Sequence, residues 1–187
     1  AQFEHTIYIG DASESYHINN TIPIIKSLRN DINIVHKQYP EYGRGIVDQG
    51  NTVKKMLEFV EEEYVVASGD DDYFIPKSLD KCVEFLENNN EFTSVHGYGT
   101  FLTYHENEGK HKIGGKYILS EYKANSASER FKLMLNRYSV LFFSVHRTKI
   151  YRKAFKNIEK LPLHPALFVE VMPAHMSAIL GKSKKLD

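Results

Sequence analysis

The sequence predicts an α/β fold, because strand-like and helix-like segments alternate through residues 1–90. The predicted strands are short runs rich in β-forming residues at 6–9, 32–36 and 64–67. The predicted helices carry apolar residues at helical spacing around 20–28, from Asn51, and after Pro76. Strands that alternate with helices are typical of a parallel sheet covered on both faces. We therefore expect a three-layer sandwich with a mostly parallel central sheet.

The second half of the chain has a different pattern, which predicts antiparallel strands and further helices. Residues 92–105 are rich in β-forming residues, and 112–119 are expected to return antiparallel after a turn at 106–110. A strand of large apolar residues is predicted at 140–145. The predicted helices are 126–136 with Ser126 or Ser128 as its cap, 151–158, and 169–180 with Gly181 as its terminator.

Length and composition fit one domain of ordinary globular character, spanning residues 1–187. The formal net charge is +0, which gives no electrostatic footprint for nucleic acid. Cys82 is the single cysteine, so neither an intrachain disulfide nor a thiolate zinc site is expected. No apolar run has the length of a membrane span and no secretory signal is visible, so the expected location is the cytoplasm.

Three adjacent carboxylates, Asp70, Asp71 and Asp72, carry the strongest functional signal. They follow the predicted strand at 64–67 and precede the helix signal at Pro76, which is the edge where open α/β sheets bind ligands. Mg²⁺ and Mn²⁺ prefer carboxylate oxygens, and Mg²⁺ sites use one or two carboxylates together with substrate phosphates. The triplet therefore predicts a metal that holds a diphosphate. The alternative is a solvated acidic turn.

Each of the other candidate residues has an ordinary structural alternative. Asp11 follows the first predicted strand, where its carboxylate suits either a base or ribose, or an Asx turn. Glu170 lies within an apolar run, where desolvation would raise its pKa and make it a better proton acceptor; otherwise it lies on an exposed helix face. His175 or His164 is a candidate metal ligand, although most histidines are surface or core residues. Arg147 suits a phosphate, but a surface charge at a strand end is favoured.

The ordered set of these motifs resembles the nucleotide-binding half of family 2 glycosyltransferases, across roughly residues 5–182. The resemblance rests on Gly10-Asp11-Ala12-Ser13 after a strand, Asn51 at the start of a helix, and Ser68-Gly69-Asp70-Asp71-Asp72 followed by Pro76. It implies a Rossmann-like glycosyltransferase-A fold, the fold of nucleotide-diphospho-sugar transferases. Residues 1–90 would bind the nucleotide sugar and 91–187 the acceptor. The family's first strand–helix unit, with its Pro-Thr-Tyr-Asn-Arg-like loop, has no match here, so an N-terminally incomplete domain is expected.

The resemblance also implies a role for each candidate residue. The metal would be bound by Asp72 and His175, and Glu170 would be the general base. The donor would be bound by Asp11, Asn51, Asp70 and Asp71. The implied reaction is a metal-dependent, inverting transfer of a sugar from a nucleoside-diphosphate sugar to a hydroxyl of a glycan or lipid-linked acceptor. Mn²⁺ or Mg²⁺ would be the cofactor, and bacterial surface polysaccharide synthesis the setting. The expected site of action is the cytoplasm or the inner face of the membrane, reached through segments outside this chain.

Two other functions stay open on the sequence. A sugar-phosphate nucleotidyltransferase has a related sheet and also uses Mg²⁺, but its Gly-rich N-terminal loop with Lys and Arg is not visible here. A non-catalytic module that binds nucleotide sugars or glycans is the second alternative.

The candidate general base departs from the pattern of family 2 glycosyltransferases. In that family the base is often Asp or part of Glu-Asp, whereas Glu170 is followed by Val171.

Overall fold

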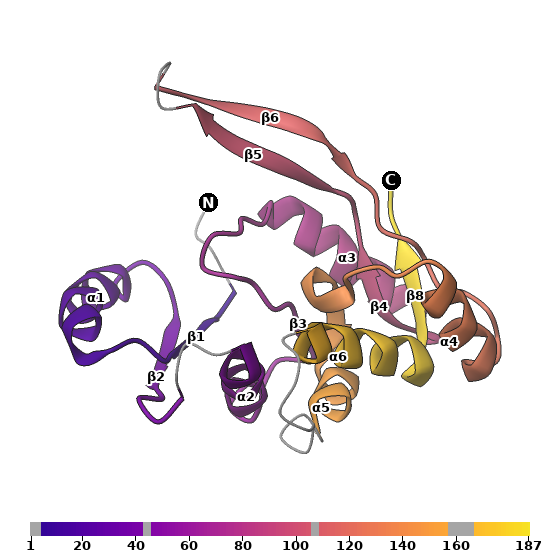
Figure 1. Ribbon diagram of the computed structural model, residues 1–187, viewed down its shortest axis with the longest axis horizontal. Coiled ribbons are helices and arrows are strands. Elements are labelled where there is room, and N and C mark those ends of the chain that lie inside the picture. The colour runs from indigo at the N-terminus through magenta and orange to yellow at the C-terminus, as the bar shows by residue number, and fades with distance from the viewer. Residues whose placement is uncertain (1–4, 43–45, 106–108, 157–166) are drawn as a thin grey trace. The chain divides into compact units, whose positions relative to one another are not determined.

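The computed structural model describes residues 5–42, 46–105, 109–156 and 167–187, and it confirms a mixed α/β fold (Figure 1). The chain divides into two compact units. The first comprises Ala1–Glu62 with Phe155–Met172, and the second comprises Glu63–Ala154 with Pro173–Asp187.

The first unit is built on a pair of parallel strands. Its elements are β1 (Ile7–Asp11), α1 (Ser15–Leu28), β2 (Ile34–Gln38) and α2 (Ile46–Leu57). Strand β1 pairs with β2 in a register that places Asp11 opposite Gln38. Helix α2 packs directly on β1, because a Cβ atom placed on Gly10 would lie only 2.7 Å from Met56 Cγ. The sequence therefore requires glycine where this helix crosses the strand.

The second unit contains a four-stranded sheet of mixed direction. Its strands are β3 (Tyr64–Val65), β4 (Phe92–His96), β7 (Val145–Arg147) and β8 (Lys182–Lys185), in the order β3-β7-β4-β8. Strand β7 is antiparallel to both β3 and β4, whereas β4 and β8 are parallel. Helix α3 (Pro76–Asn88) covers one face, where Cys82 and Leu86 pack on Val95 and Val145.

The remaining elements of the second unit are a hairpin and several helices. Strands β5 (Gly99–His105) and β6 (Lys110–Tyr117) form an antiparallel ribbon, followed by α4 (Ala127–Asn136), the 3₁₀ helix η2 (Leu141–Phe143) and α5 (Thr148–Phe155). Helix α6 (Leu167–Leu180) leads into β8, and its second half belongs to this unit. A second core contains Tyr122, Met134, Leu141, Ala174 and Ala178.

Two arginines hold this unit together by donating to backbone carbonyls. The Arg147 guanidinium donates to the carbonyls of Phe92 at 3.0 Å and Leu86 at 2.6 Å, and it lies over the Tyr64 ring. It thereby ties the last turn of α3 to the sheet. The expectation that Arg147 is a surface charge at a strand end is wrong, because its side chain is turned inward to satisfy these carbonyls. Arg130 likewise donates to two carbonyls in the last turn of α6, those of Ala178 and Ile179.

The structure confirms most predicted elements and corrects several boundaries. Ser126 caps α4, accepting a hydrogen bond from the Glu129 amide at 3.2 Å. Helix α2 begins at Ile46, so Asn51 lies inside the helix and not at its start. The strand predicted at 140–145 is wrong for most of its length: η2 occupies the centre, and β7 begins only at Val145. An apolar run alone does not distinguish a strand from a buried helical turn.

The helix that follows is shifted toward the N-terminus relative to the prediction. Helix α5 is Thr148–Phe155, whereas 151–158 was expected, and residues 157–166 lie outside the described part of the chain. The turn at 106–108 also lies outside it. None of the described helices combines the length and apolar character that crossing a membrane requires.

Candidate functional site

The acidic turn, residues Gly69–Asp72, lies between β3 and α3. The Gly69 amide donates to Asp72 Oδ2 at 3.2 Å, and Ser68 Oγ donates to the Gly69 carbonyl at 2.9 Å. A Cβ atom placed on Gly69 would lie 2.8 Å from Asp72 Oδ2 and 2.9 Å from Asp71 Oδ1. The carboxylates of Asp71 and Asp72 therefore converge over the glycine, which has no side chain to separate them.

The charges of the acidic turn are left to the solvent. Asp70, Asp71 and Asp72 are exposed, and none of them forms an ion pair with a described residue. Helix α3 begins at Pro76, with three residues between the acidic turn and the helix, and its N-cap makes no side-chain hydrogen bond. The amides of a first turn attract anions, so a negative ligand with its own cation suits this position.

The chemistry of the acidic turn fits a hard divalent cation that is shared with a ligand. Two converging carboxylates supply the oxygen atoms that Mg²⁺ and Mn²⁺ prefer, and water or phosphate oxygens complete such shells. Among the residues that the structure describes, no three His, Cys, Asp or Glu side chains are close enough to hold a metal ion. A cation at this turn would therefore depend on oxygens from its ligand.

Asp11 forms a buried pair with a histidine of the neighbouring strand. Its Oδ2 atom lies 3.0 Å from His36 Nε2, and its Oδ1 accepts a hydrogen bond from the Ser13 amide at 2.9 Å. Burial alone would raise the pKa of the Asp11 carboxyl, but hydrogen bonds from Ser13 and the proximity of His36 outweigh it, so this pKa is lowered. The Asx turn considered for Asp11 is present, and the carboxylate stays charged at the end of β1.

Asn51 lies on α2, the helix that packs on β1. Thr52, the next residue, packs on Gly10, the residue before Asp11. Asp11 and Asn51 are therefore carried by two directly packed elements of the first unit. His36 also lines an open depression along β2 with a volume of about 470 Å³. The sequence pattern did not single out His36, which lies in the middle of β2 and reaches Asp11 only through the register of the two parallel strands.

Glu170 lies in the first turn of α6 and is exposed. Of the two alternatives considered for Glu170, the exposed helix face is confirmed and burial within the apolar run is not. Successive residues of a helix point about 100° apart, so a helix with apolar sequence on most sides still presents some residues to the solvent.

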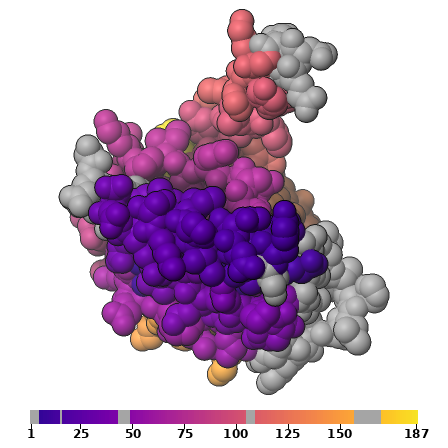
Figure 2. Space-filling view, turned by 90° about the vertical axis from the view of Figure 1, so that its left-hand side faces the viewer, coloured from indigo at the N-terminus to yellow at the C-terminus, as the bar shows by residue number. Residues whose placement is uncertain are grey.

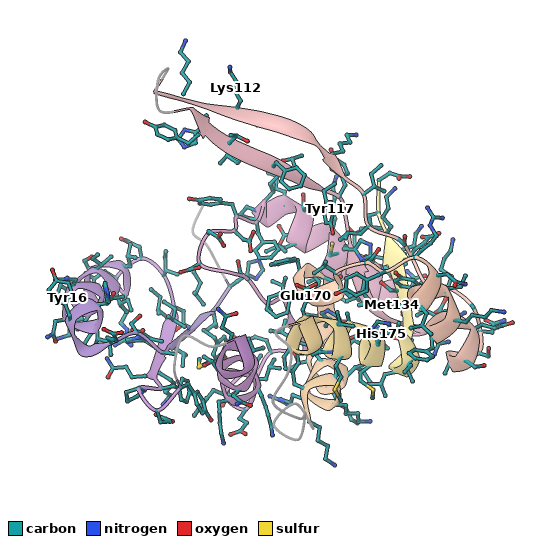
Figure 3. The ribbon with its side chains drawn as sticks, in the orientation of Figure 1. Tyr16, Lys112, Tyr117, Met134, Glu170 and His175 are labelled. Carbon is teal, nitrogen blue, oxygen red and sulfur yellow. The ribbon has the colours of Figure 1, made fainter. Side chains whose placement is uncertain are left out.

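His175 lies between two aromatic rings of the second unit. It stacks on Tyr138 with a centroid distance of 5.9 Å and meets the Phe131 ring edge-on at 5.5 Å. Figure 3 shows His175 on α6, on the same helix as Glu170. The structure does not bring His175 and the acidic turn into a three-ligand cluster, so its role as a metal ligand stays a prediction. His164 lies outside the described residues.

The most strongly perturbed carboxylate is Glu121, which the sequence did not single out. Burial alone would raise its pKa, but hydrogen bonds from Lys123, Lys184 and the Lys185 amide lower the pKa to about 2. Lys184 Nζ lies 2.9 Å from Glu121 Oε2, and Lys123 pairs with the other oxygen. These partners come from separate parts of the chain, so no local sequence pattern predicts the cluster.

A buried polar pair lies on the sheet face opposite α3. His96 Nδ1 and Ser144 Oγ are 3.2 Å apart on adjacent strand ends, and His146 Nε2 lies 2.7 Å from the Leu141 carbonyl. Burial lowers the pKa of both His96 and His146 to about 4. Both imidazoles are therefore neutral at physiological pH, which suits an interior packed against Tyr151.

No protein-family model matches this sequence, and no curated protein matches it either. A function therefore has to be argued from the chemistry of the site, because folds of this class host many unrelated activities.

Proposed function

We propose that this chain carries the catalytic residues of a metal-dependent, inverting glycosyltransferase. It would move a sugar from a nucleoside-diphosphate sugar to a hydroxyl of a glycan or lipid-linked acceptor, in the synthesis of a bacterial surface polysaccharide. The observation that carries the proposal is the acidic turn. Two carboxylates converge over Gly69 without an ion pair to a described residue, with three residues between the acidic turn and α3.

The roles proposed for the acidic residues follow from their surroundings. Asp72, whose carboxylate is oriented by the Gly69 amide, would hold Mn²⁺ or Mg²⁺. Asp70 and Asp71 would bind the donor beside it. When bound, a divalent ion neutralises the charge of the leaving nucleoside diphosphate. The positive end of the α3 dipole favours the same negative groups.

The nucleoside part of the donor is assigned to the first unit. Asp11 stays charged and is fixed by His36 and Ser13, so its remaining lone pairs suit hydroxyl or amine donors of a ribose or base. Asn51 would add an amide donor and acceptor from α2. Glu170 would take the proton from the acceptor hydroxyl, and its exposure leaves it accessible to an acceptor from solution.

The finer fold is part of the same proposal: a three-layer, Rossmann-like sandwich around a mostly parallel sheet, as in the glycosyltransferase-A fold. The parallel pairs β1–β2 and β4–β8 support it. Strand β7 departs from it, since both of its pairings are antiparallel.

The test is a thermal-shift screen of UDP, GDP, CDP and dTDP, each with and without Mn²⁺. A ligand that binds only the folded state raises the melting temperature, by an amount that grows with its concentration relative to its Kd. We expect one nucleotide to raise the melting temperature in the presence of metal only. Asp72→Asn should remove that shift. Asp31→Asn, the same substitution at an exposed aspartate in another turn, should retain it.

Two results would count against the proposal. A shift that is independent of metal would favour a binding module without metal-dependent transfer. No shift with any nucleotide, in this chain and in a chain extended at its N-terminus, would reject a nucleotide-sugar site. Release of nucleoside diphosphate from a nucleotide sugar, followed by chromatography, then separates an enzyme from a binding module.

A further inference from the structure

The β5–β6 hairpin extends away from the helices and sheet of its own unit. Figure 1 shows the two strands as a ribbon beyond α3 and β4, and the view in Figure 2, turned by 90°, shows it standing clear as well. Every residue of β6 is exposed. An isolated two-stranded hairpin is only marginally stable in water, so a ribbon of this kind gains from a surface that covers it.

The exposed side chains of the ribbon are large and apolar. Its strands and their immediate flanks carry Tyr98, Phe101, Leu102, Tyr104, Ile113, Tyr117 and Ile118, which are between 42% and 76% exposed. They pack mainly on one another across the strands: Phe101 meets Tyr117 with a centroid distance of 6.0 Å, and Leu102 pairs with Ile113. Clusters of exposed apolar side chains of this size mark contact surfaces in soluble proteins.

The same ribbon is basic along its second strand. Lys110, Lys112 and Lys116 lie on β6, and neither β5 nor β6 contains a carboxylate. Lys116 Nζ lies 4.3 Å from the centre of the Tyr98 ring. Figure 3 shows Lys112 near the tip of the ribbon and Tyr117 near its base. The turn contributes Glu106 and Glu108, which lie outside the described residues.

The base of the ribbon opens into a charged cleft of about 590 Å³. Exposed Ile118, directly after β6, lines this cleft together with Arg137, Lys184 and Lys185. The carboxylates of the cleft are Glu121, which pairs with Lys184, and Asp187, which pairs with Lys185. Among the described residues, the basic side chains of β6 and the cleft outnumber these two carboxylates, in a chain whose formal net charge is +0. The two lysines of the cleft are paired, so the excess of positive charge comes from Arg137 and from the lysines of β6.

We propose that the hairpin and the cleft at its base form a docking surface for a lipid bilayer with anionic headgroups. Tyrosine and phenylalanine suit the interface between headgroups and acyl chains, while lysines beside them attract anionic lipid. A ribbon with apolar and basic side chains presents both properties together. The inference does not depend on the proposed transferase activity, since it uses none of the residues assigned to that reaction.

The experiment is sedimentation of the full chain with vesicles, with phosphatidylcholine alone compared with phosphatidylcholine mixed with phosphatidylglycerol. We expect binding to the mixed vesicles and little to the neutral ones. Replacing Lys110, Lys112 and Lys116 together by Gln should weaken partitioning about 100-fold, because each lysine near an anionic bilayer contributes roughly fivefold. Replacing Lys77, Lys81 and Lys153, which are equally exposed, should leave partitioning unchanged.

A second set of variants tests the apolar contribution. Replacing Phe101, Leu102 and Ile113 by Ser should also abolish binding, whereas Ser at Tyr16 and Ile24 of α1, which are similarly exposed, should not. Because these side chains also pack across the hairpin, circular dichroism compares the strand content of each variant with the wild type. The Lys→Gln set leaves that apolar packing in place and is therefore the decisive comparison. Equal binding to both vesicle types, or full binding by the hairpin variants, would overturn the proposal. Absence of binding by the wild-type chain to either vesicle type would also overturn it. If light scattering then showed that the Ser variants convert a dimer to a monomer, the ribbon would be a contact between two copies of the chain.

Discussion

Arg130 offers the sharpest test of how the second unit is held together. Its side chain is buried and donates to four backbone carbonyls: Nε to Ala178 at 2.6 Å, Nη1 to Ala124 and Asn125 at 2.8 Å, and Nη2 to Ile179 at 2.8 Å. Two of these carbonyls belong to the last turn of α6, where a helix has no internal donors left. Arg130→Met removes every donor at once while keeping an unbranched apolar side chain.

The expected loss of stability follows from these contacts. Hydrogen bonds from a charged donor contribute about 1.5–3 kcal/mol each to stability. Folding also removes the guanidinium from water, and this desolvation cancels part of the gain. Arg130→Met leaves four carbonyls without this donor, and a buried acceptor without a partner costs about 1–3 kcal/mol. The avoided desolvation of the guanidinium offsets part of that sum, so we expect a loss of about 3–5 kcal/mol. Arg130→Lys should lose less, because an ammonium keeps the charge near the helix C-terminus yet reaches fewer carbonyls.

The assay is thermal unfolding followed by circular dichroism. For a chain of this length each 1 kcal/mol lowers the melting temperature by about 2–4 °C, so Arg130→Met should melt roughly 10 °C lower than the wild type. Arg29→Met, at an exposed arginine after α1, is the matched control and should change little. A drop of less than about 3 °C for Arg130→Met would refute the reasoning, because the four carbonyls would then be satisfied without the guanidinium.

Further predictions concern pH, packing and the proposed site. Because His96 is neutral when folded and its pKa is lowered to about 4, the unfolded chain binds the extra proton between pH 6.5 and 4. The free energy of unfolding, measured with urea, should therefore decrease as the pH is lowered from 6.5 to 4. His96→Gln should reduce the slope of that free energy against pH by about 1.4 kcal/mol per pH unit, and an unchanged slope would contradict the lowered pKa. Gly181→Ala should cost about 1–3 kcal/mol in urea unfolding, since the new Cβ would lie 2.6 Å from Thr93 Cβ, and a neutral effect would contradict this close approach. Gly69→Ala should leave the melting temperature within about 2 °C but weaken metal-dependent nucleotide binding, because its Cβ separates the two converging carboxylates; intact binding would argue against that geometry. Glu170→Gln should keep donor binding and slow transfer by about 10²-fold or more in a product assay, and a loss of donor affinity instead would make Glu170 a binding residue.

The sequence was a good guide wherever a local pattern decides the structure. The helical spacing after Pro76 predicted α3, and Ser126 was correctly expected to cap α4. Local patterns failed where partners come from distant segments. Strand β8 has the sequence Lys-Ser-Lys-Lys, which has no strand signal, and it forms because β4 offers a parallel edge beside it. Gly181 was expected as a helix terminator, but close approach to Thr93 is the stronger reason for glycine there.

The same distinction between local patterns and distant contacts applies to the candidate site. The acidic turn was predictable because three adjacent carboxylates between a strand and a helix form a local pattern. The pairing of Asp11 with His36 depends on the register of two strands, which the sequence does not contain in any one segment. For Glu170, the neighbours in sequence left burial open as one alternative, while helix geometry turns its side chain to the solvent.

The place of β7 in its sheet has a consequence for how the chain acquires its structure during synthesis. Strands β3 and β4 leave the ribosome early, yet each is paired with β7, which is made long afterwards. Until then both strands have unpaired edges, and only α3 is available to shield the apolar face of β4. Contacts that join such distant segments form slowly, and unpaired strands are prone to aggregate in the meantime. The nascent chain is therefore most vulnerable between the synthesis of β4 and that of β7, which is the interval in which a chaperone would protect it most.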